Sequence, residues 1–498
     1  MSVVTPPPAG RQRPDGDGLE LVVELVGAAP ASCSYVEARW VGRRAQRVLV
    51  AGGSVQELSD AETAGVGVRV RVGDGWGFSA TADLSPAGAR GALERAIALA
   101  GAQPARPEPA LAPVAPARGH WAGPCQRDPF AVSVEDKLAL LLLAEEALRG
   151  DARVMRSEAE CRAITTDKAF ASSEGAACTQ RLTECGGGIR AFAVNEHGLQ
   201  VRSYPSAHGG SVAAAGFEHL LGLDLPAAAP RVADEAVALL GAPPCPAMTT
   251  TLVLGDEQLA LQVHESIGHA LELDRMLLDE AAYAGTSWVA PADLGRLRYG
   301  SETLEVTADA TLPGALGTFG WDDEGVAARR LRLIERGRLV AALSDRRSAA
   351  ELEGQESGGC ARAEGFARQP IVRMTNVSIE PGEAGSLEDL IAATDHGVYM
   401  ETNRSWSIDD RRLHFQFATE VGREIRGGRL GRLYRNPSYA GVTPAFWGSL
   451  DAICSRPAWR VWGLLNCGKG EPGQEMHVSH GAAPARFRDV QVGVARAA

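Results

Sequence analysis

The sequence predicts an α+β protein with two domains, on three observations. At 498 residues, the chain is longer than one ordinary hydrophobic core supports. Up to about residue 240, short strand patterns alternate with helical patterns, whereas strand and turn signals dominate the second half. We therefore expect an N-terminal α/β-sandwich-like domain with an antiparallel sheet at 19–240. A β-dominated C-terminal domain should follow at 241–498, carrying one helix with two histidines.

The first elements have clear local signatures. Residues 1–18 are rich in Pro and Gly, which predicts a disordered N-terminal tail. The stretch VGVRVRVGDGWGFSAT (66–81) alternates with a period of two residues and is broken by Asp-Gly, which predicts a hairpin. Residues 86–102 predict an amphipathic helix. The Pro/Ala-rich connector at 103–128 is expected to run extended over the surface.

A second helix is expected over 133–150, where Ser133 is a good N-cap and Asp136 completes a capping-box-like pair. Alternating segments over 153–204 fit one antiparallel sheet. The Pro-rich stretch GAPPCPAMTT (241–250) then separates the two domains.

The C-terminal domain opens with TLVLGD, a predicted strand, and we expect Asp256 to cap the helix that carries His264. Beyond that helix, Gly-rich breaks separate segments with strand patterns. These are LEVTADAT, RRLRLIERGRLVAALS, PIVRMTNVSIEPG and HFQFATEVGREIRGGRLGRLY. Strands should therefore dominate this domain.

Composition narrows the function classes. The net charge of −12 disfavours a nucleic-acid-binding role, which needs a basic face. No stretch approaches the roughly 20 apolar residues of a membrane helix, and the start of the chain has no apolar segment typical of a secretory signal. Nine cysteines without any C-x-x-C pair indicate reduced thiols. We therefore expect a cytoplasmic protein without a membrane or nucleic-acid partner.

The stretch HESIGHALELDR (264–275) raises the question of a metal site. In a regular α-helix each residue advances about 100°, so His264 and His269, five residues apart, would point about 140° apart and could not share one metal ion. A single π-turn with i→i+5 bonding would return His269 to the same side. Gly268 would lower the steric cost of that distortion. The alternative is that both histidines are ordinary core or surface residues.

A catalytic zinc site needs three protein ligands and an open position. Cys467, in the Gly-rich turn NCGKGEPGQ, is a candidate third ligand because a thiolate in such a loop can approach a metal closely. A buried, inert cysteine is the alternative. His477 and His480 form a rival pair in HVSH.

Seven stretches together resemble the TldD/PmbA (TldD/TldE) family of metallopeptidases, and specifically its TldD-like, metal-bearing member. The resemblance covers almost the whole chain from about residue 19. The stretches are GVGVRV…GWGFSATADL, HESIGHALELD, GTFGWDDEGV, RMTNVSIEPG, GVYMETNRSWSID, NPSYAGVTPAFW and NCGKGEPGQ.

The resemblance implies a zinc-dependent peptidase that degrades unstructured peptides or trims a peptide precursor, as in the maturation of natural products. It implies His264, His269 and Cys467 as ligands of Zn²⁺, and Glu265 as the general base that also carries the proton to the leaving amine. These ligands are typical of the catalytic subunit of the family. The resemblance also implies a dimer, either with a second copy of the chain or with a TldE/PmbA-like subunit.

Two rival functions stay open from the sequence. A fourth protein ligand, His477 or His480, would close the site and make the metal structural in a binding module. An amidase or carrier-protein processing enzyme could use the same zinc chemistry on a non-peptide tail.

Neighbouring acidic residues could orient the imidazoles. Glu272 and Asp274 follow on the same helix, and Asp322, Asp323 and Glu324 form an acidic loop. For each of them, an ordinary helix-surface or turn residue is the alternative. The strand in VRMTNVSIE could also be an edge strand that pairs with an extended peptide, or an ordinary internal strand.

Overall fold

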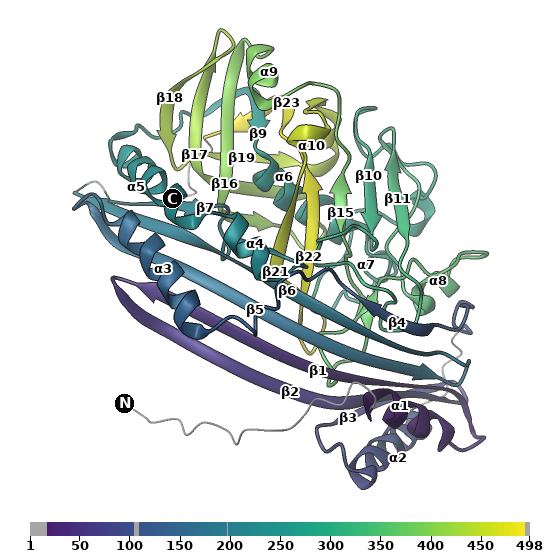
Figure 1. The fold of residues 1–498 in the computed structure, drawn as a ribbon. Coiled ribbons are helices and arrows are strands. Elements are labelled where there is room, and N and C mark those ends of the chain that lie inside the picture. The colour runs from purple at the N-terminus through teal and green to yellow at the C-terminus, as the bar shows by residue number, and fades with distance from the viewer. Residues whose placement is uncertain (1–16, 104–108, 197, 494–498) are drawn as a thin grey trace.

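The computed structural model describes residues 17–103, 109–196 and 198–493 (Figure 1). The tail predicted at 1–18 lies outside the described residues, except for Asp17 and Gly18, which begin helix α1 (Asp17–Gly27). Residues 104–108 of the predicted connector also lie outside them.

An eight-stranded sheet dominates the N-terminal half. Its strands follow the order β3-β2-β1-β5-β6-β4, and β7 and β8 both pair with β6. All pairs are antiparallel except β4–β6, which confirms the predicted antiparallel sheet. The strands are β1 (Cys33–Ala51), β2 (Ser54–Val72), β3 (Gly75–Thr81), β4 (Arg118–Ala122), β5 (Val154–Ser172), β6 (Ala177–Asn195), β7 (Gly198–Tyr204) and β8 (Ser211–Ala213).

Three local predictions in this half are confirmed. Strands β2 and β3 form the predicted hairpin, with Gly73 at a positive φ of 58° in the turn. Helix α2 (Pro86–Ala102) has the predicted bounds. Helix α3 (Val134–Leu148) begins after Ser133, whose side chain accepts a hydrogen bond from the backbone N–H of Asp136.

Two helices and a short strand are among the elements that the sequence patterns missed. Helices α4 (Phe217–Gly222) and α5 (Leu225–Gly241) lie where no helix was expected, and Pro230 stands inside α5. A proline inside a helix removes a hydrogen bond, so the pattern favoured a break. The connector predicted as extended contains β4, a short strand that lies on the edge of the large sheet.

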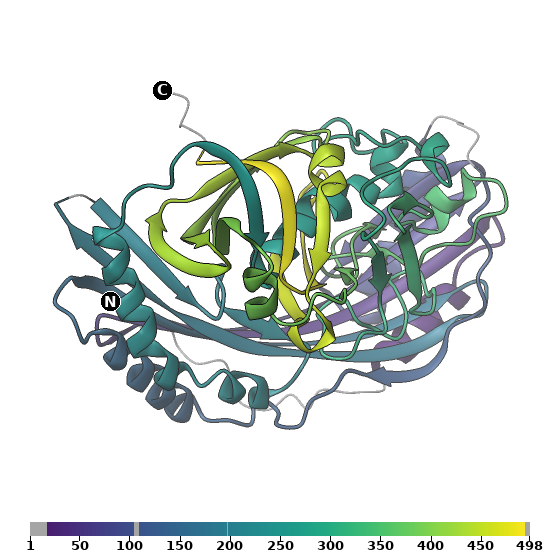
Figure 2. The same cartoon turned by 90° about the horizontal axis from the view of Figure 1, so that it is seen from above.

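Helices and the C-terminal domain cover opposite faces of the large sheet (Figures 1 and 2). On β5, the side chains of Ala159 and Cys161 pack in the cluster under α3 and α5, and those of Ala169 and Ala171 in the cluster under α1 and α2. Side chains alternate along a strand, so Lys168 points to the other face, where its ammonium group pairs with Asp323 of the C-terminal domain.

A ring of five strands forms the centre of the C-terminal domain. Strands β16, β9, β23, β19 and β17 pair in that order, and β16 also pairs with β17, which closes the ring. Strands β18 and β20 extend it at β17 and β23. The strands are β9 (Met248–Leu254), β16 (His396–Ile408), β17 (His414–Arg426), β18 (Arg429–Arg435), β19 (Ser438–Val442), β20 (Leu450–Ile453) and β23 (Ala485–Val492).

Three smaller sheets and short helices complete the domain. The sheets pair β12-β11-β10-β15, β13-β14 and β21-β22, so the prediction of a β-dominated domain is confirmed. Their strands are β10 (Val306–Asp309), β11 (Arg330–Glu335), β12 (Arg338–Leu339), β13 (Ala361–Arg362), β14 (Ile371–Val372), β15 (Val377–Ile379), β21 (Arg460–Lys469) and β22 (Gln474–Ala482). The helices are α6 (Asp256–Val263), α7 (Leu273–Met276), α8 (Arg346–Ala350), α9 (Leu387–Ala392) and α10 (Thr443–Gly448).

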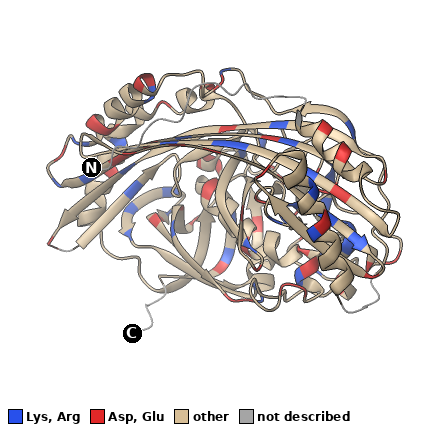
Figure 3. Cartoon of the chain, turned by 90° about the horizontal axis from the view of Figure 1, so that it is seen from below, with Lys and Arg blue, Asp and Glu red and all other residues tan. Residues whose placement is uncertain are grey.

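In the part of the chain that the structure describes, no helix has the length and apolar character needed to span a membrane. Lys and Arg residues lie interspersed with Asp and Glu residues along the sheet and the helices (Figure 3).

Candidate metal centre

Helix α6 carries the first histidine into the interior. Residues Gln258 to Val263 are all buried, and the phenol of Tyr439 from β19 exchanges hydrogen bonds with Gln258 and Gln262. The predicted cap is wrong by one residue: Gly255 is the N-cap and Asp256 is the first helical residue, without a side-chain capping bond. The Asp256 carboxylate instead accepts a hydrogen bond of 3.3 Å from the Trp462 indole.

The helix widens between the two histidines, as predicted. Residues His264–Gly268 form a π-turn, and the backbone N–H of His269 donates to the carbonyl of His264, an i→i+5 bond. The φ of Gly268, −52°, is ordinary for a helix, so the backbone conformation alone does not call for glycine. A Cβ there would lie 2.0 Å from Sδ of buried Met374, so glycine leaves room for that side chain beside the turn.

Side chains from other elements hold the turn in place. The Ser266 hydroxyl donates to the carbonyl of Gln262 at 2.7 Å and accepts from the Trp447 indole at 2.9 Å. The hydroxyl of Tyr299 donates to the carbonyl of Ser266. Because each of these groups is buried, a change in helix register would leave several polar atoms unpaired.

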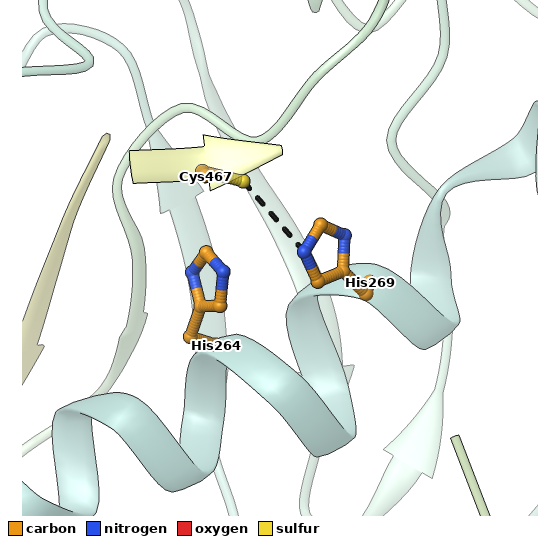
Figure 4. Close-up of side chains that lie close together, drawn as sticks. All are labelled: His264, His269 and Cys467. Carbon is orange, nitrogen blue, oxygen red and sulfur yellow. Dashed lines mark hydrogen bonds between the residues drawn. The ribbon is translucent and has the colours of Figure 1, made fainter. Parts of the chain in front are cut away.

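The widened turn brings both imidazoles to one side, facing Cys467 (Figure 4). The ring centroids of His264 and His269 lie 4.7 Å apart, and Sγ of Cys467 lies 3.6 Å from Nε2 of His269. One ligand atom from each of the three buried residues lies within 4.8 Å of the other two. A nitrogen and a sulfur bound to one tetrahedral zinc are about 3.6 Å apart, so this donor set fits a zinc ion.

Cys467 reaches the histidines from the β21–β22 hairpin. The strand register shifts between Leu464 and Cys467, and such an irregularity changes the direction of side chains along a strand. Burial alone would raise the pKa of the Cys467 thiol, but the nearby Arg373 guanidinium and His269 outweigh burial and leave that pKa below its ordinary value. A thiol with a lowered pKa is a better metal ligand.

His269 is oriented by a charged network. Its Nδ1 lies 3.0 Å from the carboxylate of Glu272, as predicted for Glu272 from the sequence. That carboxylate also lies 2.7 Å from Nε of Arg275 and 3.4 Å from Nζ of Lys469. Although burial would raise the pKa of Glu272, Lys469 and His269 hold it well below its ordinary value. The carboxylate accepts a hydrogen bond from Nδ1–H of His269, which leaves the lone pair on Nε2, the atom that faces Cys467.

His264 is oriented by a neutral relay. Its Nδ1 lies 2.8 Å from Nε2 of His480, and Nδ1 of His480 lies 2.7 Å from the carbonyl oxygen of Val377. A carbonyl only accepts, so His480 carries its proton on Nδ1 and accepts from His264 through Nε2. His264 therefore keeps its proton on Nδ1 and has a free lone pair on Nε2. Burial lowers the pKa of His264 to about 4, so the ring is neutral.

The hydrogen bonds of His480 and His477 argue against these two residues as metal ligands. Both nitrogens of His480 are engaged, by His264 and by Val377. Nδ1 of His477 lies 2.5 Å from the Glu184 carboxylate of the large sheet. Within the described residues, the cluster that could hold a metal has three members, which leaves room for a substrate or water in a tetrahedral site.

Glu265 is held by two residues that the sequence patterns did not single out. Its Oε1 accepts a 2.8 Å hydrogen bond from the indole of Trp406, and its Oε2 accepts a 2.8 Å hydrogen bond from the guanidinium of Arg412. Trp406 lies within the motif GVYMETNRSWSID, and Arg412 follows it closely in the chain. That motif was the available signal, but nothing in the sequence indicated which glutamate these side chains contact.

The other acidic residues considered as supports have different roles. The Asp274 carboxylate binds the ammonium group of Lys469 at 2.7 Å. In the loop Asp322–Glu324, Asp323 pairs with Lys168 at 2.9 Å and Glu324 pairs with Arg69 at 2.6 Å. The expectation that this loop orients the imidazoles is therefore wrong, because it fastens the C-terminal domain to the large sheet.

Strand β15 is an edge strand, one of the two alternatives that the sequence left open. Residues of β22 already lie along that edge. The carbonyl of Val377 accepts from His480, and the Ser378 hydroxyl accepts from the backbone N–H of Gly481. This part of the edge therefore supports the metal centre.

Comparison with known protein families agrees with the geometry. Three models of one family match consecutive parts of the chain: PmbA/TldA metallopeptidase domain 1 over 36–100, the central domain over 127–241 and the C-terminal domain over 247–494. The chain belongs to the PmbA/TldD metallopeptidase family. Membership in this family makes it a metal-dependent peptidase, and its C-terminal domain is the part that holds the cluster of His264, His269 and Cys467.

Individual relatives agree with this family. A protein of Methanothermobacter thermautotrophicus named metalloprotease is 29% identical over 92% of this chain and 95% of its own length. A protein of Saccharolobus solfataricus named zinc metalloprotease TldD homolog is 27% identical over 49% of this chain and 51% of its own length. The crystal structure of TldE from Thermococcus kodakarensis covers 95% of this chain and 99% of its own, with a TM-score of 0.72. At 15% identity, that structure shows the shared fold alone.

Proposed function

We propose that this chain is the metal-bearing, TldD-like subunit of a zinc peptidase, with His264, His269 and Cys467 as ligands and Glu265 as general base. The observation that carries the proposal is the buried His-His-Cys cluster. Both of its imidazoles have a partner on Nδ1, which leaves Nε2 of each to bind a metal, and Nε2 of His269 already lies 3.6 Å from Sγ of Cys467. The name of the Saccharolobus relative favours zinc, and so does the mixed nitrogen and sulfur donor set.

Bound zinc supplies Lewis acidity toward a peptide carbonyl and makes a water molecule more acidic. The residues of the chain supply the remaining chemistry. Glu265, next to the first ligand in sequence, accepts a proton from the attacking water and passes it to the leaving amine. Trp406 and Arg412 can only donate hydrogen bonds, so Glu265 is the proton acceptor of this group.

The burial of the cluster indicates the substrate class. His264, His269 and Cys467 are each only 2–3% exposed, so a folded protein surface cannot reach them. A single extended chain is thin enough to do so. The substrate we propose is therefore an unstructured peptide, or the flexible leader of a peptide precursor, as in natural-product maturation.

Two further features complete the proposal. The partner would be a second copy or a TldE-like subunit; the shared fold with TldE supports this only at the level of architecture. All nine cysteines are free thiols, which fits a reducing compartment such as the cytoplasm.

One experiment with two variants tests the proposal. The full-length protein is purified with and without a TldE-like partner, its zinc is measured, and it is incubated with an unstructured peptide. Cys467→Ala should lose most of its zinc and its activity. Glu265→Gln, which is nearly isosteric, should keep its zinc and lose about 10²–10⁴-fold in turnover. Full zinc content in Cys467→Ala, or normal cleavage by Glu265→Gln, would remove that residue from its proposed role.

A further inference from the structure

The turn between β16 and β17 places the guanidinium of Arg412 next to Glu265. Arg412 of this turn and Trp406 of β16 each donate a 2.8 Å hydrogen bond, one to each oxygen of the Glu265 carboxylate. We infer that Trp406 and Arg412 are positioning residues, here called the carboxylate clamp, that hold Glu265 in the orientation needed for proton transfer. This inference rests on the proposed function, in which Glu265 is the general base.

The geometry favours a positioning role. A carboxylate oxygen has two lone pairs, and each clamp residue occupies one lone pair on a different oxygen. The carboxyl group therefore cannot rotate without breaking a hydrogen bond, while each oxygen can still accept a proton. Glu265 is 6% exposed, and the Arg412 side chain is 16% exposed, so water competes weakly for these hydrogen bonds.

The turn itself is built to hold Arg412. Arg412 adopts a left-handed φ of 62°, which is unfavourable for a side chain of this size. Several contacts fix this conformation. The Asp409 carboxylate accepts from the backbone N–H of Leu413 and of His414, and the Thr443 hydroxyl donates to the carbonyl of Arg412. Such a strained residue, fixed from several sides, is typical of functional sites.

The N-terminal half of the chain supports the other clamp residue. His208, in the loop before β8, packs edge-on against the Trp406 ring with centroids 5.2 Å apart. Its Nε2 also lies 3.2 Å from Oδ1 of Asn403, on the same strand as Trp406. The orientation of Glu265 thus depends on contacts from both halves of the chain.

The decisive variant is Arg412→Gly. Glycine adopts a positive φ without strain, so the turn should persist while the guanidinium is lost. In the full-length, zinc-loaded protein acting on an unstructured peptide, kcat should fall about 10²-fold, the effect of misplacing a catalytic group by about 1 Å. KM and zinc affinity, measured by competition with a chelator, should stay near wild type. Millimolar guanidinium should restore at least part of kcat.

Two further variants sharpen the test. Trp406→Phe keeps an aromatic ring against His208 but removes the indole N–H, so it should lower kcat about 10-fold without changing zinc affinity. Arg411→Ala removes the same charge from an exposed position of the same turn and should leave kcat unchanged.

Each other outcome has a definite meaning. If Glu265→Gln is inactive while Arg412→Gly keeps wild-type kcat, the clamp is overturned and the proposed function stands. If Arg412→Gly raises KM alone, Arg412 binds substrate and is not a positioning residue. If it loses zinc or melts early without guanidinium rescue, its role is structural. If Glu265→Gln remains active, the proposed function itself fails.

Discussion

Glu257 and Glu272 lie at opposite ends of one helical segment, and their surroundings shift the carboxyl pKa in opposite directions. Glu272 faces Arg275 at 2.7 Å and Lys469 at 3.4 Å, and its pKa stays well below the ordinary value. Glu257 accepts one backbone hydrogen bond, from Asn403 at 3.1 Å. Burial first, and then the carboxylates of Glu420 and Asp256, raise its pKa to about 8.

The comparison shows which physical effect prevails at a helix end. Glu257 lies in the first turn of α6, where the helix dipole favours an anion by at most about 2 kcal/mol. Removing an unpaired carboxylate from water costs several kcal/mol, so burial prevails and Glu257 is neutral below pH 8. At Glu272, two cations reverse that outcome, and the resulting anion orients the ligand His269. The nearby cations Arg275 and Lys469, rather than the position along the helix, therefore keep Glu272 ionised beside the metal centre.

The largest expected effect comes from removing the anion at Glu272. Glu272→Ala leaves the buried ammonium of Lys469 and guanidinium of Arg275 with one partner fewer, which should cost about 3–5 kcal/mol of unfolding free energy. Glu272→Gln keeps an acceptor for His269 but not the charge, so zinc affinity should fall about 10–100-fold. Urea denaturation of the metal-free protein and chelator competition measure the two effects. If Glu272→Gln bound zinc as wild type does, the charge at this position would have no role in the metal centre.

A smaller effect is expected from the neutral support of the other histidine. His480→Phe removes the acceptor of His264 and the donor to Val377 but leaves no charge unpaired. We expect about a 10-fold loss of zinc affinity, at the low end for residues that orient a metal ligand. The exposed His396, replaced by Ala, is the matched control and should bind zinc as wild type does. If His480→Phe weakened zinc binding more than Glu272→Gln, the charged network would not be the stronger support.

Local features of the fold could be predicted from the sequence because they depend on nearby residues. The hairpin at 66–81, the cap at Ser133 and the π-turn at His264 each follow from spacing or turn chemistry within a few residues. Helix α5 could not be predicted, because packing of residues such as Val232 and Leu240 against the large sheet overrides the penalty of Pro230.

The site shows the same division. The three residues of the cluster could be named from family motifs, but their supports could not. His480 lies 216 residues from His264 in the chain, and Arg412 lies 147 residues from Glu265. His480 looked like a rival ligand because residue type alone does not tell which nitrogen remains free. Only the contact with the Val377 carbonyl decides that.

The smallest effect, and the one that most sharpens the comparison, is expected at Glu257. The wild-type carboxyl group keeps its proton in the folded state up to about pH 8, whereas it ionises near pH 4.5 in the unfolded chain. Between these values the unfolded state binds fewer protons, so unfolding free energy should fall as pH rises, and the loss should be complete above about pH 8. Glu257 keeps partial exposure because it lines a pocket of about 20 Å³ beside His208 and Trp462. The full shift of the pKa would correspond to about 5 kcal/mol, but water in that pocket would screen the charge and lower the folded-state pKa, so we expect an effect of about 1–2 kcal/mol.

Glu257→Gln tests this directly, because an amide oxygen can still accept the hydrogen bond from Asn403 while the titration is abolished. At pH 4 the variant and the wild type should be equally stable within about 0.5 kcal/mol, since the Glu257 carboxyl group is then mostly protonated in both the folded and the unfolded state. At pH 8.5 the variant should be more stable by about 1–2 kcal/mol, whereas Glu272→Ala should be less stable than the wild type. The measurement is urea unfolding of the wild type and of Glu257→Gln across this pH range. A Glu257→Gln protein that is less stable than wild type at pH 8.5 would mean that Glu257 is ionised and paired in the folded state, and the contrast between the two ends of the segment would not hold.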